Sequence, residues 1–195
     1  MLASGSPRRR ELLERLGLEF DVVPADIDES VRPGEGAIAY VERLAKEKAA
    51  AVGGDREVVI AADTTVEIDG EILGKPYTPE AATLRWRQMR GRTGMLHSGH
   101  SVIRVGGGTS STEAHAVAAA SVSFAADVTD AEIGAYVASG EPLHVAGAFT
   151  IDSLGGAFID RVDGDPSTVV GMSLSTVRRL AGQLGVTWTD LWNRG

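Results

Sequence analysis

A continuous apolar run of strand length, Val58 to Ala62, ends at a carboxylate, Asp63. A strand that is apolar on both of its alternating faces is expected to be buried on both, which requires a sheet covered by other elements. Around this run the chain alternates predicted strands with amphipathic helices, without an internal repeat or a low-complexity linker. The pattern therefore predicts an α/β or α+β domain with helices around a sheet.

Capping and turn signals set the expected boundaries of these elements. Ser6-Pro7 fits the N-cap and first position of one helix, and Thr129 with Glu132 fits a capping box for another. The predicted helices cover residues 7–16, 36–52 (stopped by Gly53-Gly54), 79–89, 129–139 and 173–184. The predicted strands cover residues 1–4, 20–23, 58–62, 66–68, 71–73, 95–105, 114–124 and 157–162, with turns at Asp69-Gly70, Gly106-Gly107-Gly108 and Asp163-Gly164.

Composition and charge exclude several classes of protein. With 195 residues, 43% hydrophobic and 24% charged, the chain is expected to fold as one domain over residues 1–195. The absence of cysteine excludes disulfides and thiolate zinc sites and favours a reducing cytoplasm. A formal charge of -8 argues against a binder of DNA or RNA polymers. No apolar run approaches the roughly 20 residues of a membrane span, and no signal-peptide stretch precedes the arginines, so neither a membrane partner nor export is expected.

Positive charge nevertheless gathers near the start of the chain, at Arg8, Arg9, Arg10 and Arg15. The segment from Ser4 to Arg9 combines a strand end, a small-residue turn and a helix start, so that backbone N–H groups and two hydroxyls converge as in an anion site. Arginines in a first helical turn oppose the helix dipole, which costs about 0.3–1 kcal/mol per charge. This cluster favours a small polyanion as ligand. The alternative is that Glu11 and Glu14 neutralise the arginines on a solvated helix face.

The helix predicted over residues 36–52 holds two lysines in different positions. At about 100° per residue, Lys48 falls inside the apolar arc of this helix and Lys46 falls outside it. The apolar members of the arc are Val41, Leu44, Ala45, Ala49 and Val52. Lys46 is expected to be a solvated charge. An amine that faces inward must snorkel to the surface or find an anion, and both outcomes stay open for Lys48.

Three further side chains are candidates for phosphate or metal chemistry. Asp63 is predicted to close a buried strand, where a carboxylate could hold a divalent cation or accept a proton from an attacking water. Lys75, held extended by the following proline, could present a point charge to a phosphate. Glu29, in an acidic loop, could supply a second oxygen ligand. Each has a plainer interpretation too: Asp63 as a partner of loop amides, and the other two as hydrated surface charges.

Taken in order, several segments resemble the Maf family of nucleoside triphosphate pyrophosphatases, also called septum formation inhibitors. They are residues 2–9 (LASGSPRR) with 11–13 (ELL), 43–49 (RLAKEKA), 62–66 (ADTTV), Gly70 with 74–76 (GKP), 139–142 (SGEP) with 146–148 (AGA), and 169–171 (VVG). Each segment alone is weak, whereas the ordered set spans the chain and is highly specific. The resemblance therefore raises the functional interpretations above the plainer ones.

The resemblance implies hydrolysis of a nucleoside triphosphate between its α and β phosphates, which releases a monophosphate and pyrophosphate and removes modified or unwanted nucleotides. It also implies a mixed twisted sheet with surrounding helices and a deep cleft, as in Maf and ITPase-like proteins, and a homodimer. Asp63 would be the proton acceptor and, with Glu29, would hold a divalent cation, Mg²⁺ or Mn²⁺. The residues around the phosphates would be Ser4, Arg8, Arg9, Lys48 and Lys75.

Base selectivity is expected to depend on Arg8, Thr64 and Asp152. Arg8 and Thr64 resemble the family branch that acts on dTTP and UTP. That branch carries Gln at the position of Asp152 and an Asp-Lys pair where this chain has His144-Val145, and His144 is more like the branch acting on 7-methylguanosine triphosphate. Because a carboxylate accepts hydrogen bonds but does not donate them, Asp152 predicts a base preference different from that of the Gln-bearing enzymes.

Two other functions fit parts of the pattern. A non-catalytic nucleotide-binding regulator of cell division, acting in septum formation, could use the same cleft, although Asp63 and Lys75 count against it because a pure binder needs no base. A phosphatase of the aspartyl-phosphate kind would need a second acidic residue at position 65, which is Thr65 in this chain.

Overall fold

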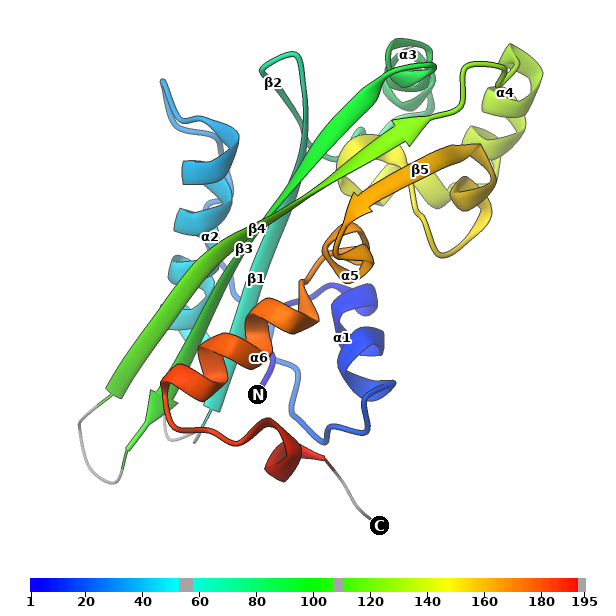
Figure 1. The fold of residues 1–195 in the computed structure, drawn as a ribbon. Coiled ribbons are helices and arrows are strands. Elements are labelled where there is room, and N and C mark those ends of the chain that lie inside the picture. Colours follow the sequence, from blue (N-terminus) through cyan, green and yellow to red (C-terminus); the bar gives the residue numbers. More distant parts are fainter. Residues whose placement is uncertain (53–57, 107–110, 193–195) are drawn as a thin grey trace. The chain divides into compact units, whose positions relative to one another are not determined.

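The computed structural model describes residues 1–52, 58–106 and 111–192 (Figure 1). Within these residues the strands form a five-stranded sheet in the order β2-β1-β3-β4-β5. The strands are β1 (Val58–Ile68), β2 (Glu71–Leu73), β3 (Thr93–Val105), β4 (Ser111–Phe124) and β5 (Ile159–Gly164). Pairing is antiparallel between β1 and β2 and between β4 and β5, whereas Leu2 makes parallel bridges to Val22 and Ile60. The antiparallel sheet with helices, to which Leu2 adds isolated parallel bridges, confirms the predicted α/β fold class.

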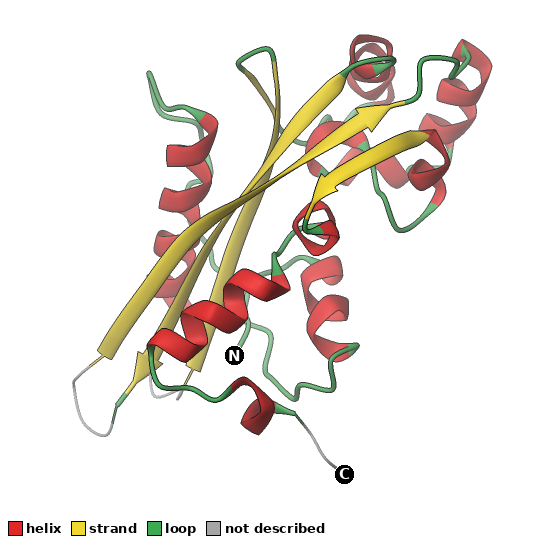
Figure 2. Cartoon of the chain, viewed as in Figure 1, coloured by secondary structure: helices red, strands yellow, loops and turns green. Residues whose placement is uncertain are grey.

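Two helices precede the first strand along the chain, and the others lie between and after the strands (Figure 2). The α-helices are α1 (Pro7–Glu14), α2 (Ala37–Val52), α3 (Pro79–Met89), α4 (Asp130–Ala138), α5 (Pro166–Val170) and α6 (Leu174–Gln183). Short 3-10 helices are η1 (Glu141–His144), η2 (Ala146–Ala148), η3 (Leu154–Phe158) and η4 (Trp188–Leu191). Over the described residues, no helix is both long and apolar enough to cross a membrane.

The chain forms two compact units, each built from separate stretches of sequence. The first unit comprises Met1–Asp63, Ser98–Ala118 and Gly171–Gly195. The second unit comprises Thr64–His97 and Ala119–Val170. The strands β1, β3 and β4 each contribute residues to both units.

In the first unit β1 is buried on both faces, as the apolar run predicted. Its residues alternate between two clusters, because successive side chains of a strand point to opposite faces. One cluster contains Leu13, Ile60, Ala62, Met172 and Leu180, and the other contains Ala3, Ala49, Val59 and Ala61. Asp63 follows the alternation of Val59 and Ala61, so it lies on the face that packs against α2.

Gly99 brings the backbone of α2 close to β3. A Cβ at this position would overlap with the carbonyl oxygen of Val41 and the amide nitrogen of Glu42. Val41 and Leu44 lie on the fully buried side of α2. The missing side chain therefore allows the buried side of α2, which also carries Lys48, to rest directly on the sheet.

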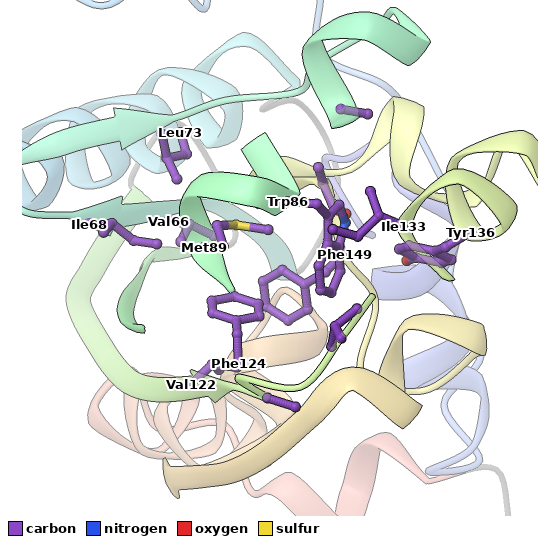
Figure 3. Close-up of a cluster of buried hydrophobic side chains, with 14 of the residues drawn as sticks. Val66, Ile68, Leu73, Trp86, Met89, Val122, Phe124, Ile133, Tyr136 and Phe149 are labelled. Carbon is purple, nitrogen blue, oxygen red and sulfur yellow. The ribbon is translucent and has the colours of Figure 1, made fainter. Parts of the chain in front are cut away.

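The second unit has an aromatic core, drawn in Figure 3. Trp86 of α3 is completely buried, and its Nε1 donates to the carbonyl oxygen of Ala148 at 2.7 Å. The rings of Phe124 and Tyr136 contact Trp86 edge-on, with centroids 5.7 and 5.4 Å away. Edge-to-face aromatic pairs stabilise a core beyond their area alone, so α3 and α4 are held firmly in this unit.

Several local predictions are confirmed and others are wrong. The capping box of Thr129 and Glu132 is present, and Asp69 and Gly70 both have positive φ, 51° and 82°, as a two-residue hairpin turn requires. By contrast, the strands predicted over residues 1–4 and 20–23 are reduced to isolated bridges of Leu2 and Val22. The stop at Gly53-Gly54 and the Gly107-Gly108 part of the predicted loop lie outside the described residues.

Boundaries near the ends of elements are also corrected. The helix predicted to reach Leu16 ends at Glu14. The strand predicted from residue 157 starts at Ile159, because residues 154–158 form η3 instead, and Gly164 ends β5 rather than lying in a turn beyond it.

Candidate active site

One arginine of the N-terminal cluster is buried in the first unit. Arg9, in the first turn of α1, is 9% exposed. Its Nε donates to the carbonyl oxygen of Gly171 at 2.8 Å, and its Nη1 donates to Ser4 Oγ at 3.2 Å. Burial lowers the pKa of Arg9 from its usual value, while Asp63 and Glu29 act in the opposite direction. Arg9 is therefore a positioned cation within electrostatic range of two carboxylates.

Other arginines of the cluster follow the plainer interpretation. Arg10 pairs with Glu14 at 2.6 Å and Arg15 with Glu11 at 3.8 Å, all on the exposed side of α1. Glutamates on a solvated helix face thus neutralise the charges of Arg10 and Arg15, but not that of Arg9. Arg8, next to Arg9 in the same turn, is half-buried.

The turn before α1 depends on Ser4. Ser6 is the N-cap residue of α1, as predicted, but its side chain makes no capping hydrogen bond. Instead, the Ser6 N–H donates to Ser4 Oγ at 3.2 Å, and the same oxygen accepts from Arg9. Ser4 is buried, so a single hydroxyl connects the small-residue turn to the buried guanidinium.

The inward-facing lysine of α2 finds two anions. Lys48 is buried, and its Nζ lies 2.6 Å from Asp63 Oδ1 and 2.8 Å from Glu29 Oε1. Lys46 behaves as the helical arc predicted: it is partly exposed and pairs with Glu42 at 2.7 Å on the helix surface. The contrast between the two lysines arises from their places on one helix, since only Lys48 follows Leu44 by one turn on the buried side.

Asp63 lies in the interior of β1 and not at its end. The prediction that it closes the strand was wrong, because the chain continues through Thr64, Thr65 and Val66 in extended conformation as far as Ile68. These three residues are β-branched and favour a strand. Asp63 is 7% exposed, so its carboxylate is a buried group on the sheet.

The loop that carries Glu29 is fastened to α2 by residues that the sequence reasoning did not single out. Tyr40 OH donates to the backbone carbonyl of Glu29 at 2.9 Å, and Arg43 Nη2 donates to that of Ser30 at 3.0 Å. Arg43 also binds both carboxylate oxygens of Glu35, at 2.6 and 2.7 Å. Tyr40 and Arg43 are three residues apart on α2, a spacing that places them on one side of the helix and could have marked them.

The electrostatics of this loop follow from the same contacts. The pKa of Glu35 is lowered to about 2, chiefly by its hydrogen bond with Arg43. The pKa of Tyr40 is raised to about 12, first by burial and then by the negative charges of Asp63 and Glu29. The phenol of Tyr40 therefore stays protonated and keeps its hydrogen bond to the loop.

Asp63 and Glu29 are two carboxylates that could hold a divalent cation. Both carboxylates converge on one point, now held by Lys48 Nζ. Mg²⁺ prefers oxygen ligands and commonly uses one or two carboxylates together with substrate phosphates and water. The described residues hold no group of three or more His, Asp or Glu side chains suited to a metal ion. Among these residues, the two carboxylates would thus supply only part of the ligands of a cation.

The other predicted site residues belong to the second unit. Thr64 is its first residue and is half-buried, whereas Lys75 and Asp152 are exposed. His144 is exposed as well, and its ring lies edge-on to Tyr77 with centroids 6.2 Å apart. Contacts join Arg9 to Ser4, and Lys48 to Asp63 and Glu29, while Arg9 interacts with the two carboxylates electrostatically. The functional roles of these residues, like those of Arg8, Lys75, Thr64 and Asp152, stay predictions.

A cavity of about 520 Å³ lies elsewhere in the first unit and has the wrong charge for a phosphate. Three of its lining residues are acidic: Glu14, Glu19 and Asp21. Anionic walls repel an anion, so this cavity does not suit a phosphate ligand.

The fold and these contacts describe an α/β protein with a site of paired carboxylates and buried cations, and comparison with known proteins places it in a family. The family described as Maf-like protein matches residues 1–184, and the chain belongs to this family. It is 55% identical over 207 residues to a protein of Leifsonia xyli named nucleoside triphosphate pyrophosphatase, covering 99% of this chain and 96% of that one. Two further proteins of the same name are similar over most of their lengths. The one from Salinispora tropica is 48% identical, covering 100% of this chain and 88% of that protein. The one from Nocardia farcinica is 45% identical, covering 98% of this chain and 95% of that protein.

Proposed function

We propose that this chain hydrolyses nucleoside triphosphates to the monophosphates and pyrophosphate. The observation that carries the proposal is the convergence of Arg9, Lys48, Asp63 and Glu29 in the first unit. The relatives reported above are named nucleoside triphosphate pyrophosphatases, which supports an enzyme over the alternative of a non-catalytic division regulator. We further propose that the chain acts as a homodimer in the cytoplasm, where it removes modified or unwanted nucleotides.

The positive side chains would bind the phosphates. Arg9 cannot rotate away, because Gly171 and Ser4 fix two of its nitrogens, so it presents its charge from one place. Lys48 would exchange part of its contact with the carboxylates for a phosphate oxygen. Cations positioned where negative charge develops commonly provide the largest part of such catalysis. Arg8 and Lys75 would add contacts to the same phosphates, and Ser4 would shape the turn beneath them.

Asp63 would act as the proton acceptor. Its carboxylate is buried and held at one oxygen by Lys48, so it keeps a defined orientation on the rigid strand β1. A water bound beside it would transfer a proton to it while attacking the α phosphorus, and the bond from that phosphorus to the bridging oxygen would break as pyrophosphate leaves. A positioned general base of this kind contributes about 10²–10⁴-fold to a rate.

A divalent cation, Mg²⁺ or Mn²⁺, would be held by Asp63 and Glu29. When bound, it would supply Lewis-acid stabilisation of the phosphate charges. The role of the chain is to fix the second carboxylate: Tyr40 and Arg43 hold the backbone at Glu29 and Ser30, so Glu29 is presented toward Asp63. The Glu29 side chain is 46% exposed, which leaves it accessible from solvent.

The decisive experiment measures pyrophosphate release with Mg²⁺ or Mn²⁺ from dTTP, UTP, CTP and 7-methyl-GTP. We expect the intact chain to release pyrophosphate and not phosphate, and Asp63→Asn to lower kcat by roughly 10²–10⁴-fold. A best substrate other than dTTP or UTP is expected, because Asp152 replaces the Gln of the enzymes that prefer those two.

Asp28→Asn is the matched control for the loss of one charge. Asp28 lies in the same acidic loop and accepts from the N–H of Ser30 at 2.9 Å, but it is exposed and separate from Lys48. Its variant should keep kcat within a few-fold. If Asp63→Asn retained full turnover, or if no nucleotide released pyrophosphate, the proposed function would be wrong.

A further inference from the structure

A single carboxylate in the second unit binds much of one loop. Glu141 follows α4 at the start of η1. Its Oε1 accepts from the N–H of Gly155 at 3.0 Å and from the hydroxyl of Thr150. Its Oε2 accepts from Ser153 Oγ at 2.7 Å and from the N–H of Leu154 at 3.2 Å. Both oxygens are thus used to hold residues 150–155, called the 150–155 loop below.

Glu141 is itself fixed to the aromatic core. Tyr136 OH donates to Glu141 Oε1 at 3.0 Å, and the Tyr136 ring packs edge-on against Trp86. The N–H of Glu141 donates to Ser139 Oγ at 3.2 Å, whose hydroxyl in turn donates to the carbonyl of Tyr136 at 2.6 Å. The carboxylate is therefore a rigid connection between α4 and the 150–155 loop.

Tight packing restricts the conformation of the 150–155 loop. A Cβ at Gly155 would lie 2.5 Å from Tyr136 OH and 2.6 Å from the carbonyl oxygen of Thr150, which no real side chain tolerates. Hydrogen bonds to an ionised acceptor are also about twice as strong as neutral ones. Without the charge of Glu141, the hydrogen bonds from the amides of Leu154 and Gly155 would weaken, and a Gln in its place would leave one of the two amides without its acceptor.

The residue expected to select the base stands in the middle of this loop. Asp152 is exposed, and Thr150 and Ser153 on either side of it both bind Glu141. We infer that Glu141 is a positioning residue for base recognition, which holds the 150–155 loop so that Asp152 is presented in one orientation. The inference rests on the proposed function, in which Asp152 contacts the base. Glu141 acts through the loop and takes no part in the chemistry at Asp63.

The test compares Glu141→Gln and Ser153→Ala with the wild type on dTTP, UTP, CTP and 7-methyl-GTP. Glu141→Gln keeps the shape but replaces one acceptor by a donor, and Ser153→Ala removes one exposed contact with little risk to folding. We expect the ratio of kcat/KM between the best and the second-best nucleotide to fall by roughly tenfold in Glu141→Gln and by less in Ser153→Ala, mainly through KM.

A double variant separates positioning from a general structural effect. If Glu141 acts through Asp152, Glu141→Gln combined with Asp152→Ala should lose no more selectivity than Asp152→Ala alone. Equal loss of kcat/KM for every nucleotide, with the ratios preserved, would overturn the inference, as would additive losses of selectivity in the double variant.

Hydrogen exchange gives a readout that does not depend on activity. The amides of Leu154 and Gly155 should exchange faster in Glu141→Gln than in the wild type. Glu132→Gln is the matched control: Glu132 also binds backbone and hydroxyl donors, from Thr129, but at the other end of α4. Unchanged exchange at Leu154 and Gly155 would refute the holding role. A wild type that releases no pyrophosphate would refute the proposed function, while the exchange result would still decide whether Glu141 holds the loop.

Discussion

Lys48 is the residue on which the charge balance of the candidate active site depends. Its amine lies between the carboxylates of Asp63 and Glu29, and it is as buried as Asp63. Two carboxylates directed at one point repel each other unless a cation lies between them. Lys48 thus keeps the two carboxylates together, and in the proposed function it is also a cation for a phosphate.

Substituting Lys48 should therefore affect stability and activity together. Lys48→Met keeps the aliphatic stem but leaves Asp63 without its buried partner, and breaking a buried pair in this way costs about 3–5 kcal/mol. For a chain of this size, each lost kcal/mol lowers Tm by about 2–4 °C. We expect a clear fall in Tm by calorimetry and a large fall in kcat/KM.

Lys46→Met is the control on the same helix. Lys46 pairs with Glu42 near the surface, with a side chain 37% exposed, and such helical pairs contribute about 0.3–0.5 kcal/mol. Its variant should keep Tm within about 2 °C and retain activity. Equal effects of the two substitutions would contradict the role assigned to Lys48.

At the scale of the element, helix α2 carries several side chains of the candidate active site. Tyr40, Arg43 and Lys48 all project from this helix. Its close contact with β3 at Gly99 sets the distance between the helix and the sheet. A side chain at position 99 would push this helix outward, because it would meet backbone atoms, which cannot rotate away.

Gly99→Ala is expected to destabilise the chain by about 1–3 kcal/mol, the usual cost of overpacking a core, and to raise KM because Lys48 moves with its helix. Urea unfolding and steady-state kinetics would measure both effects. Gly182→Ala in α6 is the control: a Cβ there meets nothing within 4 Å, so this variant should be neutral or more stable by about 0.5–1 kcal/mol. Gly99→Ala as stable as the wild type would show that α2 can shift freely.

Elements with strong periodicity or caps were predictable, and so was the inward direction of Lys48. The helix over residues 79–89 and the Thr129 capping box follow from local signals, which tertiary contacts did not override. Asp63 was misplaced at a strand end, because the change from apolar to β-branched polar residues resembles a boundary although the strand continues. The acceptor of Arg9 is a backbone carbonyl at Gly171, 162 residues away, and no side-chain pattern can identify it.

For the whole molecule, acid should remove a specific part of the stability. The pKa of Glu35 is lowered to about 2 by its hydrogen bond with Arg43. Burial alone would raise the pKa of Glu141, but its hydrogen-bond donors, led by Thr150 and Ser153, outweigh burial and lower it to about 2. A carboxylate with a lowered folded pKa stabilises the protein above its unfolded pKa, and this contribution is lost as the pH falls through the folded value.

The free energy of unfolding should therefore decrease between about pH 4.5 and pH 2 through these two groups. Urea midpoints measured across this range should fall less steeply in Glu35→Gln and Glu141→Gln, which have already lost the contribution at pH 7. Glu80→Gln, at an exposed position in the first turn of α3, is the control and should follow the wild type. If the urea midpoints of the wild type and the three variants fell with pH at the same rate, Glu35 and Glu141 would not be the source of the acid sensitivity.

The order of the units along the chain has a consequence for biosynthesis. The first unit is completed only by residues from Gly171 onward, after both stretches of the second unit have been made. A nascent polypeptide that ends before Gly171 lacks the carbonyl to which Arg9 Nε donates, so its guanidinium keeps only the hydrogen bond to Ser4 of the two described above. On the ribosome, the candidate site is thus completed last, and a prematurely terminated product is expected to leave with Arg9 incompletely held.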